Sequence, residues 1–368
     1  MVDSCLLCGS PNLDSLYQPI GTQRGITVCL CSNCGLLQSL PRQTKGTGIP
    51  STSHLANYGN LRTGKIGRAQ PNLDFLRRNV PGFKPARVLD VGASRGVFVK
   101  LVLDIWPDME GIVAIEPYSN LLPFTTDDYK IEVIGLPIEE LSRFRVSLDL
   151  IACIHTLEHL DTPLDTLKKL REALDPKGWL LVEVPNIRGL MGILDVCEEV
   201  YLDKHVLHLS LNTLRKMLGL AGFRPVYYQA DYENVTVLAQ RGAIKSIKTD
   251  YEAMSIRPMV QAYASDLIKN REALKGKVWR LNRLIKNEGK PALISGGGRI
   301  LSALVEAGLD TLLFEGVVDP WLPLDEVHGL PVLNNPKMIG YVKPKVVLVC
   351  SRSSAEAMAG EAVGWQPG

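Results

Sequence analysis

Apolar and polar positions alternate in two ways through the middle of the chain. Short and nearly continuous apolar runs, typical of strands buried on both faces, occur at Val88–Val91, Gly111–Ile115, Ile131–Ile134, Leu148–Ile154 and Trp179–Val184. Apolar residues at helical spacing predict helices at Val97–Ile105, Pro163–Leu174 and Leu211–Ala221, and Val226–Leu238 supplies further strands. This alternation predicts an α/β fold, with a parallel sheet covered by helices.

The pattern changes after residue 245. A helix is predicted over Tyr251–Asn287, and its second half is rich in Lys and Arg. Because aromatic residues are sparse there, we interpret this basic stretch as a solvated helix face rather than a nucleic-acid surface. A second alternation of strands and a helix follows, at Ala292–Ile294, Ile300–Ala307, Phe314–Val318 and Val346–Cys350. It predicts a second, smaller Rossmann-like unit.

The N-terminal segment contains only short apolar runs, which cannot bury a core by themselves. It carries the pairs Cys5-x-x-Cys8 and Cys31-x-x-Cys34, each followed by a glycine. Four thiolates at this spacing are typical of a structural zinc site, and the free energy of zinc binding can fold so small a unit. We therefore expect a zinc knuckle; the alternative is four buried thiols without a metal.

Composition narrows the class of protein. A chain of 368 residues, 46% hydrophobic, can bury more than one core. Its net charge of +2 gives no strong field for nucleic acid or an anionic membrane, so small-molecule partners are expected. No apolar run reaches the roughly 20 residues of a membrane-spanning helix, and eight cysteines are too few for a disulfide scaffold. These features favour a cytoplasmic protein.

A glycine-bearing turn follows the first strand of the middle region, in Asp90-x-Gly92-x-x-x-Gly96. Backbone N–H groups at such a turn hold the polar part of a nucleotide cofactor. The turn lacks the Gly-x-Gly-x-x-Gly spacing of dinucleotide sites and suits S-adenosylmethionine better. Glu116 ends the next strand, where a carboxylate can bind ribose hydroxyls. The cofactor-binding residues are expected to be Asp90, Gly92, Ala93, Gly96, Glu116, Pro137, Ile138 and His155.

A set of motifs spread over nearly the whole chain carries a family resemblance. They are the two cysteine pairs, Leu89-Asp90-Val91-Gly92-x-x-x-Gly96, Leu157-Glu158-His159-Leu160, Glu183-Val184-Pro185-Asn186, His205-x-x-His208-Leu209-Ser210-x-x-Thr213-Leu214, and Gly296 with Val317-Val318-Asp319-Pro320. The chain resembles class I S-adenosylmethionine-dependent methyltransferases with an N-terminal zinc domain and a C-terminal Rossmann-like domain. The best-known members are C-methyltransferases of nucleotide-linked deoxysugars.

The resemblance implies an organisation and a substrate. The parts would be a zinc-binding domain (1–50), a methyltransferase domain (51–245), a helical linker (246–290) and a C-terminal Rossmann-like domain (291–368). The substrate would be a nucleotide-linked keto-sugar methylated on carbon, with no nucleic-acid or membrane partner. The family has a Tyr-His-Glu-His segment where this chain has Leu202, Asp203, Lys204 and His205, and keeps only the last histidine. Oxygen methylation, of a sugar or of another small metabolite, therefore stays open.

Three histidines are the candidates for catalysis. His205 is the first choice of base, because imidazole titrates near neutrality; the alternative is a structural histidine that caps the following helix. His155 and His159 follow the fourth strand, at the sheet edge where open parallel sheets bind ligands. The alternative for His159 is a packing role at a helix start.

Two other classes of protein stay open. The glycine-rich turn Ser295–Arg299 could mark a nicotinamide site and an oxidoreductase, although Leu301 stands where the third glycine is needed. The chain could also be a zinc-organised scaffold whose methyltransferase core is inactive. Binding of S-adenosylhomocysteine or NADH separates these alternatives.

Overall fold

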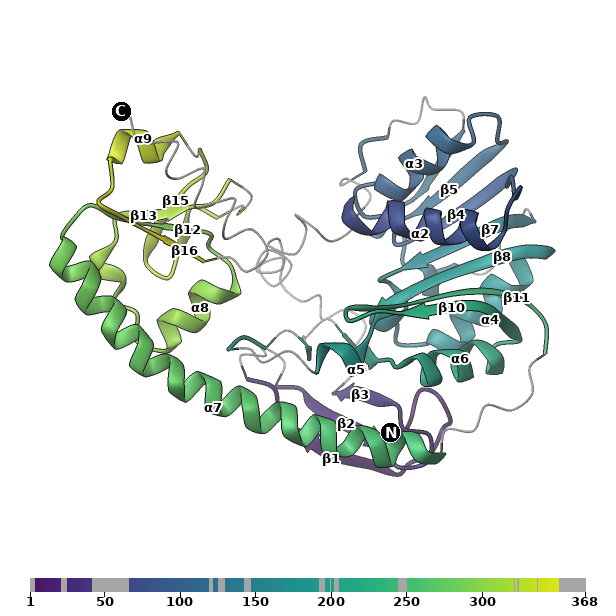
Figure 1. The fold of residues 1–368 in the computed structure, drawn as a ribbon. Coiled ribbons are helices and arrows are strands. Elements are labelled where there is room, and N and C mark those ends of the chain that lie inside the picture. The colour runs from purple at the N-terminus through teal and green to yellow at the C-terminus, as the bar shows by residue number, and fades with distance from the viewer. Residues whose placement is uncertain are drawn as a thin grey trace. The chain divides into compact units, whose positions relative to one another are not determined.

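The computed structural model describes residues 4–20, 25–41, 66–118, 122–124, 130–141, 147–191, 196–198, 200–201, 205–243, 250–320, 322, 324–335 and 337–350. They form two compact units, and the long helix α7 (Asp250–Glu288) contributes to both. The first unit holds the sheets that precede α7 and α7 itself to Ala264. The second unit includes α7 from Ser265 and the elements that follow it (Figure 1). Within the described residues, no helix is long and apolar enough to cross a bilayer.

The central sheet of the first unit has the strand order β10-β11-β8-β7-β4-β5-β6. Its strands are β4 (Arg87–Val91), β5 (Gly111–Ile115), β6 (Ile131–Ile134), β7 (Leu148–Ile154), β8 (Leu174–Pro185), β10 (Phe223–Ala230) and β11 (Asn234–Arg241). The pairs from β8 to β6 are parallel, whereas β11 is antiparallel to both of its neighbours. This mostly parallel α/β sheet is the predicted Rossmann-like fold.

Helices cover both faces of this sheet (Figure 1). They are α2 (Ile66–Asn79), α3 (Val97–Ile105), α4 (Pro163–Ala173), the short α5 (Ile187–Leu190) and α6 (Leu211–Leu220), with 3₁₀ turns η3 (Ile138–Glu140) and η4 (Leu157–His159). Apolar residues of α2 and α3 pack in one core cluster with alternate strand residues such as Val88 and Leu150. The other face packs against α4 and α6 through Leu89 and Ile151. Burial of both faces explains the continuous apolar strands.

The N-terminal residues form a second, antiparallel sheet of order β1-β2-β3-β9. Its strands are β1 (Leu13–Tyr17), β2 (Thr27–Cys31), β3 (Leu37–Leu40) and β9 (Leu207–His208). Strand β9 follows β8 and α5 far along the chain, and Leu37 lies opposite His208. The cysteine region also shares a core cluster with the central sheet, through Leu7 and Leu36. The boundary predicted at residue 50 stays a prediction.

The second unit is a smaller α/β unit with the strand order β14-β15-β13-β12-β16. Its elements are β12 (Ala292–Ser295), α8 (Arg299–Glu306), η5 (Thr311–Leu313), β13 (Gly316–Val318), β14 (Glu326–Val327), β15 (Leu330–Leu333), α9 (Met338–Val342) and β16 (Val346–Val349). The strands β15, β13, β12 and β16 are parallel. The second Rossmann-like half predicted from the apolar pattern is present.

The structure corrects two predicted boundaries. Strand β8 begins at Leu174, before the predicted start at Trp179, because Leu174 pairs with Leu148 of β7 directly after α4 ends. The pairing register then shifts between Leu148 and Leu150. In the second unit, β13 begins at Gly316 rather than Phe314, which packs into the core cluster beside Val317.

Candidate active site and metal centre

The glycine turn between β4 and α3 requires small residues. Gly92 and Gly96 have φ values of 75° and 68°, in the left-handed region that favours glycine. A Cβ atom on Gly92 would lie 2.2 Å from Oγ1 of Thr156, and one on Gly96 would lie 2.2 Å from the Phe124 ring. The N–H groups of Gly92 and Ala93 both donate to the carbonyl of Ile115, which holds the turn against β5. The turn therefore packs so closely on Thr156 and Phe124 that only glycine fits at these two positions.

Glu116 lies at the carboxyl end of β5, next to this turn. Its carboxylate is buried and accepts hydrogen bonds from the Ser94 N–H at 2.7 Å and the Tyr118 N–H at 3.1 Å. Each carboxylate oxygen can accept more than one hydrogen bond, so these contacts orient Glu116 without using all of its acceptor capacity. The predicted carboxylate thus lies where the hydroxyls of a ribose could reach it.

A pocket opens beside the turn, lined by Ala69, Asp90, Gly92, Ala93, Phe98 and Ile154. Three of the predicted cofactor residues are among them. The others come from α2, α3 and the end of β7, and make the wall largely apolar. Pro137 and Ile138 begin η3 after β6, and Ile138 packs in the same core cluster as Ile115. A glycine turn, a buried carboxylate with spare acceptor capacity and an apolar wall match the chemistry expected of a site for S-adenosylmethionine.

The four predicted zinc ligands come together in the N-terminal sheet. All four sulfur atoms lie within 4.8 Å of one another, and the pairs Cys5–Cys34 and Cys8–Cys31 are each 3.5 Å apart. Zinc with sulfur ligands at about 2.3 Å in a tetrahedron needs sulfur atoms about 3.8 Å apart. The residues present therefore fit a structural zinc ion.

Each cysteine pair has the same backbone turn. The N–H of Gly9 donates to the carbonyl of Cys5, and the N–H of Gly35 donates to the carbonyl of Cys31. Both glycines have positive φ values, of 72° and 75°. Hydrogen bonds from the Cys34 and Cys5 thiols lower the pKa of Cys31, and the contact with Cys31 raises the pKa of Cys5. The Cys31 sulfur thus accepts hydrogen bonds from neighbouring thiols. A bound cation would displace the protons of these thiols.

His155 lies between buried carboxylates at the end of β7. Its Nδ1 is 3.3 Å from Glu158, and its Nε2 is 3.4 Å from Glu183 and 2.8 Å from the side-chain oxygen of Asn234. Burial lowers the pKa of His155, but the close contacts with the Glu158 and Glu183 carboxylates outweigh it and raise the pKa. His155 is not among the residues that line the described pocket. The ring instead contacts two buried carboxylates.

His159 and His205 come together although they lie far apart in the sequence. Their ring centres are 4.9 Å apart, and the Val206 N–H donates to the Glu158 carbonyl at 2.8 Å, which ties the two segments together. Glu158 lies under both rings, with Oε1 3.9 Å from Nε2 of His159. Burial favours the protonated carboxyl, but His155 and His159 hold the pKa of Glu158 at about 2. We name Glu158, His159 and His205 the His/Glu cluster.

The helix after His205 is capped by another residue. Ser210 is the N-cap of α6, where its Oγ accepts from the Thr213 N–H and the Thr213 hydroxyl accepts from the Ser210 N–H. His205 is therefore not needed as a cap. His208 is buried and hydrogen-bonded to Ser39, and burial lowers its pKa to about 3. His208 is a neutral, structural histidine.

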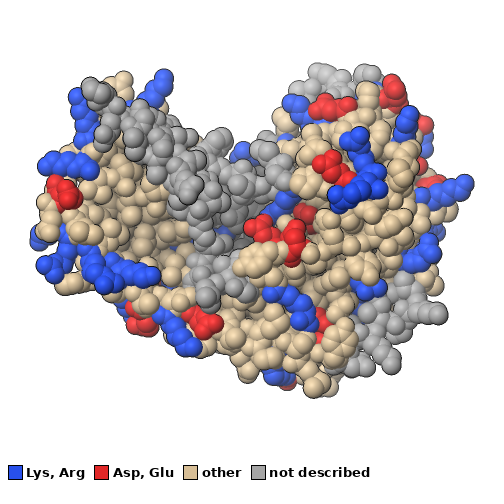
Figure 2. Space-filling view, viewed as in Figure 1, with Lys and Arg blue, Asp and Glu red and all other residues tan. Residues whose placement is uncertain are grey.

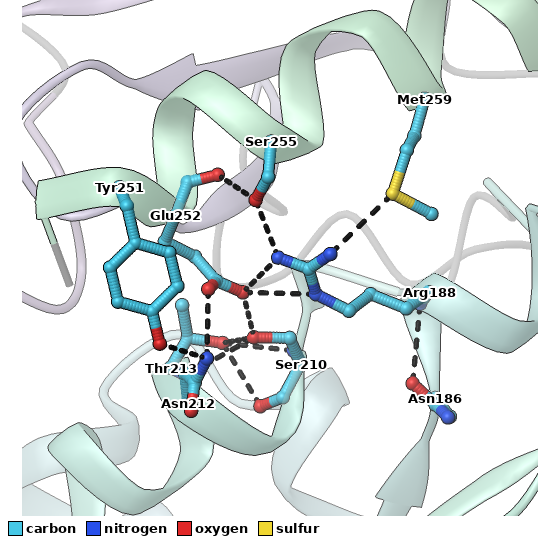
Figure 3. A network of polar contacts seen from close by, with 9 residues as sticks. All are labelled: Asn186, Arg188, Ser210, Asn212, Thr213, Tyr251, Glu252, Ser255 and Met259. Atoms are coloured by element: carbon cyan, nitrogen blue, oxygen red, sulfur yellow. Dashed lines mark hydrogen bonds and ion pairs between the residues drawn. The ribbon is translucent and has the colours of Figure 1, made fainter.

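A buried polar network fixes the start of α7 on the same unit (Figure 3). Glu252 is fully buried and accepts from Ser210 Oγ at 2.5 Å, Asn212 at 3.0 Å and Arg188, which is 3.1 Å away. Arg188 also donates to Ser255 at 2.6 Å. Gly35 has no room for a side chain here, because a Cβ would lie 2.5 Å from that of Glu252. Helices α5, α6 and α7 thus meet beside the second cysteine pair.

The basic half of α7 is largely paired or solvated. Lys269, Lys275 and Arg271 form ion pairs with Asp266, Glu272 and Glu306. Figure 2 shows Lys and Arg side chains over this part of the helix. Its apolar face, including Val278 and Ile285, packs on the second unit. This arrangement agrees with the predicted solvated face.

Comparison with known proteins defines the class of the central part. Residues 65–228 match the family model described as a methyltransferase domain. The chain is 24% identical over 161 residues to the tRNA U34 carboxymethyltransferase of Trichodesmium erythraeum (strain IMS101), covering 42% of this chain and 49% of that protein. It is 25% identical over 117 residues to the ubiquinone biosynthesis O-methyltransferase of Bordetella avium (strain 197N), covering 31% and 48%. The chain spans about half the length of these relatives.

The chain is also similar to a solved structure described as an S-adenosylmethionine-dependent methyltransferase from Clostridium acetobutylicum ATCC 824. It is 12% identical, with a TM-score of 0.40, and the match covers 52% of this chain and 98% of that one. The match to the family model, rather than the structural likeness, identifies residues 65–228 as a methyltransferase domain.

Sequence reasoning missed residues that only the fold brings to the site. Glu158 belongs to a quoted motif, but nothing in the sequence shows that its carboxylate lies between three histidines. Ala69 and Phe98 reach the pocket from helices on one face of the sheet. Thr156 was missed too; its hydroxyl donates to the Val91 carbonyl at 2.9 Å and closes the turn. Leu202, Asp203 and Lys204, which stand where the resembling family has other residues, lie outside the described residues.

Proposed function

We propose that the protein transfers the methyl group of S-adenosylmethionine to an acceptor bound at the His/Glu cluster. The observation that carries the proposal is the placement of this cluster at the carboxyl end of β7, the strand that also supplies Ile154 to the cofactor pocket. Ligands of open parallel sheets bind at this edge. When bound, S-adenosylmethionine supplies a methyl group on a positively charged sulfur.

The residues would act by binding, orienting and accepting a proton. Gly92 and Gly96 let the backbone approach the cofactor, and Glu116 would hold its ribose. In the transfer, the acceptor loses a proton, its carbon or oxygen bonds to the methyl group, and the electron pair of the broken bond returns to sulfur. We propose His205 as the base that receives the proton, with His159 beside it, and assign His155 to charge balance rather than to contact with the acceptor.

We propose a nucleotide-linked sugar as the acceptor, on the strength of the motifs that run through all parts of the chain. A second candidate is an RNA base or a quinone-like small molecule, because relatives of the central domain are named for tRNA and for ubiquinone biosynthesis. The modest net charge of +2 favours the small acceptor.

A methylation screen tests this proposal. The enzyme would be incubated with deuterated S-adenosylmethionine and, in separate reactions, with keto- and hydroxy-sugar nucleotides, transfer RNA and hydroxylated quinones. Mass spectrometry is expected to show a labelled methyl group on a sugar nucleotide. A carbon acceptor would also exchange its acidic proton with deuterated solvent, whereas a hydroxyl acceptor would leave its carbon-bound protons in place. Labelling of RNA or quinone alone would exclude a nucleotide-linked sugar as the acceptor.

A further inference from the structure

The most unusual group at the site is the carboxylate of Glu158. The residue is only 1% exposed, and neither side-chain oxygen accepts a hydrogen bond from the described part of the chain. Its nearest cationic atoms are Nδ1 of His155 at 3.3 Å and Nε2 of His159 at 3.9 Å. A buried carboxylate without hydrogen bonds is costly unless another cation satisfies it.

The groups around Glu158 leave room for a further cation. Glu158 and Glu183 are both buried, and the His155 ring lies between them. Two buried carboxylates therefore face one imidazole ring. Among the described residues, both side-chain oxygens of Glu158 and Oε1 of Glu183 have no hydrogen-bond partner.

We infer that Glu158, His159 and His205 bind a divalent metal ion. Each offers one ligand atom, and the three atoms lie within 4.8 Å of one another. Two imidazoles and one carboxylate form a ligand set that binds divalent first-row metals and leaves positions open for substrate. Ligand atoms about 2.1 Å from an ion lie roughly 3.0–3.5 Å apart, so small side-chain rotations would close the site.

This ion would be distinct from the zinc of the cysteine cluster. Thiolates select zinc, whereas oxygen and nitrogen ligands also accept manganese. The inference rests on the proposed acceptor site and refines its chemistry. The ion would bind a hydroxyl or keto oxygen of the acceptor and lower the pKa of the hydroxyl, or of the C–H group beside the ketone. The proton would then pass to water, and His205 would serve as a ligand in place of the base proposed above. The acceptor class would then be one with an oxygen at or beside the methylated atom.

Binding of Mn²⁺ alone tests the site without any acceptor. The full-length protein, with its zinc content measured first, would be titrated with Mn²⁺ by calorimetry and electron paramagnetic resonance. We expect one Mn²⁺ per chain in addition to the zinc. Glu158→Gln and His159→Ala should each weaken Mn²⁺ binding at least tenfold, while zinc content stays unchanged. His159 is partly exposed, so its variant should fold even if that of Glu158 does not.

Two matched controls separate coordination from general charge. Glu183→Gln removes the other buried carboxylate beside His155 but no ligand of the ion, and His328→Ala removes a histidine of the second unit. Both should bind Mn²⁺ within about threefold of wild type. Absence of Mn²⁺ binding, or equal affinity in wild type and His159→Ala, would overturn the inference.

Measurement of turnover tests the role of the ion independently of the binding titration. If the ion takes part in methyl transfer, a chelator that leaves the zinc in place should lower turnover, and Mn²⁺ should restore it. If loss of Mn²⁺ left turnover unaffected, the ion would have no role in the reaction, and His205 would again be the proposed proton acceptor. Failure to find any acceptor would leave the Mn²⁺ titration fully interpretable, so the two proposals fail separately.

Discussion

Ser39 of the N-terminal sheet and His208 of the methyltransferase domain share a buried hydrogen bond, with 2.8 Å between Oγ and Nε2. The Ser39 N–H also donates to the Val206 carbonyl, next to His205. The strand that carries Ser39 follows directly after Cys34 and Gly35. The segment that carries the cysteine cluster therefore helps to determine where the candidate base His205 lies.

Purified protein is expected to contain one zinc ion held by Cys5, Cys8, Cys31 and Cys34. Cys8→Ser should lose zinc and lower the melting temperature, because the small sheet has little core of its own. Elemental analysis and thermal melting measure both effects. Cys350→Ser, at a buried cysteine of the second unit, is the control and should keep its zinc. Zinc-free protein with an unchanged melting temperature in Cys8→Ser would contradict the site.

Glu116→Ala should weaken binding of S-adenosylhomocysteine by about 1–3 kcal/mol, because the carboxylate would lose its hydrogen bonds to the ribose. Calorimetry on wild type and variant gives the difference. NADH should not bind with comparable affinity, since the first turn lacks the dinucleotide spacing. Preference for NADH would overturn the cofactor assignment and revive the oxidoreductase alternative.

Gly92→Ala tests the close approach at the turn, and Gly82→Ala is its matched control. Both glycines have similar φ values, of 75° and 77°, so both variants carry comparable backbone strain. A Cβ on Gly92 would meet Thr156 at 2.2 Å, whereas one on Gly82 would meet nothing within 4 Å. Gly82→Ala should cost about 1 kcal/mol of unfolding free energy. Gly92→Ala should cost more and bind S-adenosylhomocysteine at least tenfold more weakly; equal losses in the two variants would exclude the steric argument.

His205→Gln should keep the affinity for S-adenosylhomocysteine within a few-fold and lower turnover by about two to four powers of ten, the usual effect of removing a positioned proton acceptor. Calorimetry and steady-state kinetics with the acceptor found in the screen measure the two quantities. Unchanged turnover would show that the proton leaves by another route.

His208 should make the protein sensitive to acid. Its pKa is about 3 in the folded state because of burial, against about 6.5 when unfolded. A depressed folded pKa means that stability is fully present above pH 6.5 and falls by about 1.4 kcal/mol per pH unit as the pH drops toward 3. In His208→Gln this part of the acid dependence should disappear. Urea unfolding between pH 7 and pH 5 compares the two slopes, and parallel slopes would contradict the assignment.

Local patterns predicted the elements of the central sheet well. The strands Gly111–Ile115, Ile131–Ile134 and Leu148–Ile154, and the helix Val97–Ile105, are confirmed residue for residue. Their periodicity is strong because both faces of the sheet are buried. Local motifs also predicted that Glu116 follows the end of a strand and that the two cysteine pairs come together.

Long-range pairing could not be predicted in the same way. The two-residue strand β9 has no periodicity of its own, and only its pairing with β3 makes it a strand. The burial of Glu158 likewise depends on the return of the chain at Val206, far along the sequence. These contacts, rather than any motif, give the candidate site its charge and geometry.

The antiparallel pairing of β9 with β3 would make the proposed methyl transfer sensitive to oxidation of the cysteine cluster. Oxidation of the knuckle thiolates by peroxide would release zinc and loosen the strand that follows Cys34, and with it the loop that holds His205. The parallel sheet and its cofactor pocket have their own core and would persist. Oxidised protein should therefore still bind S-adenosylhomocysteine while its catalysis is silenced, and reduction with restoration of zinc should reverse the loss.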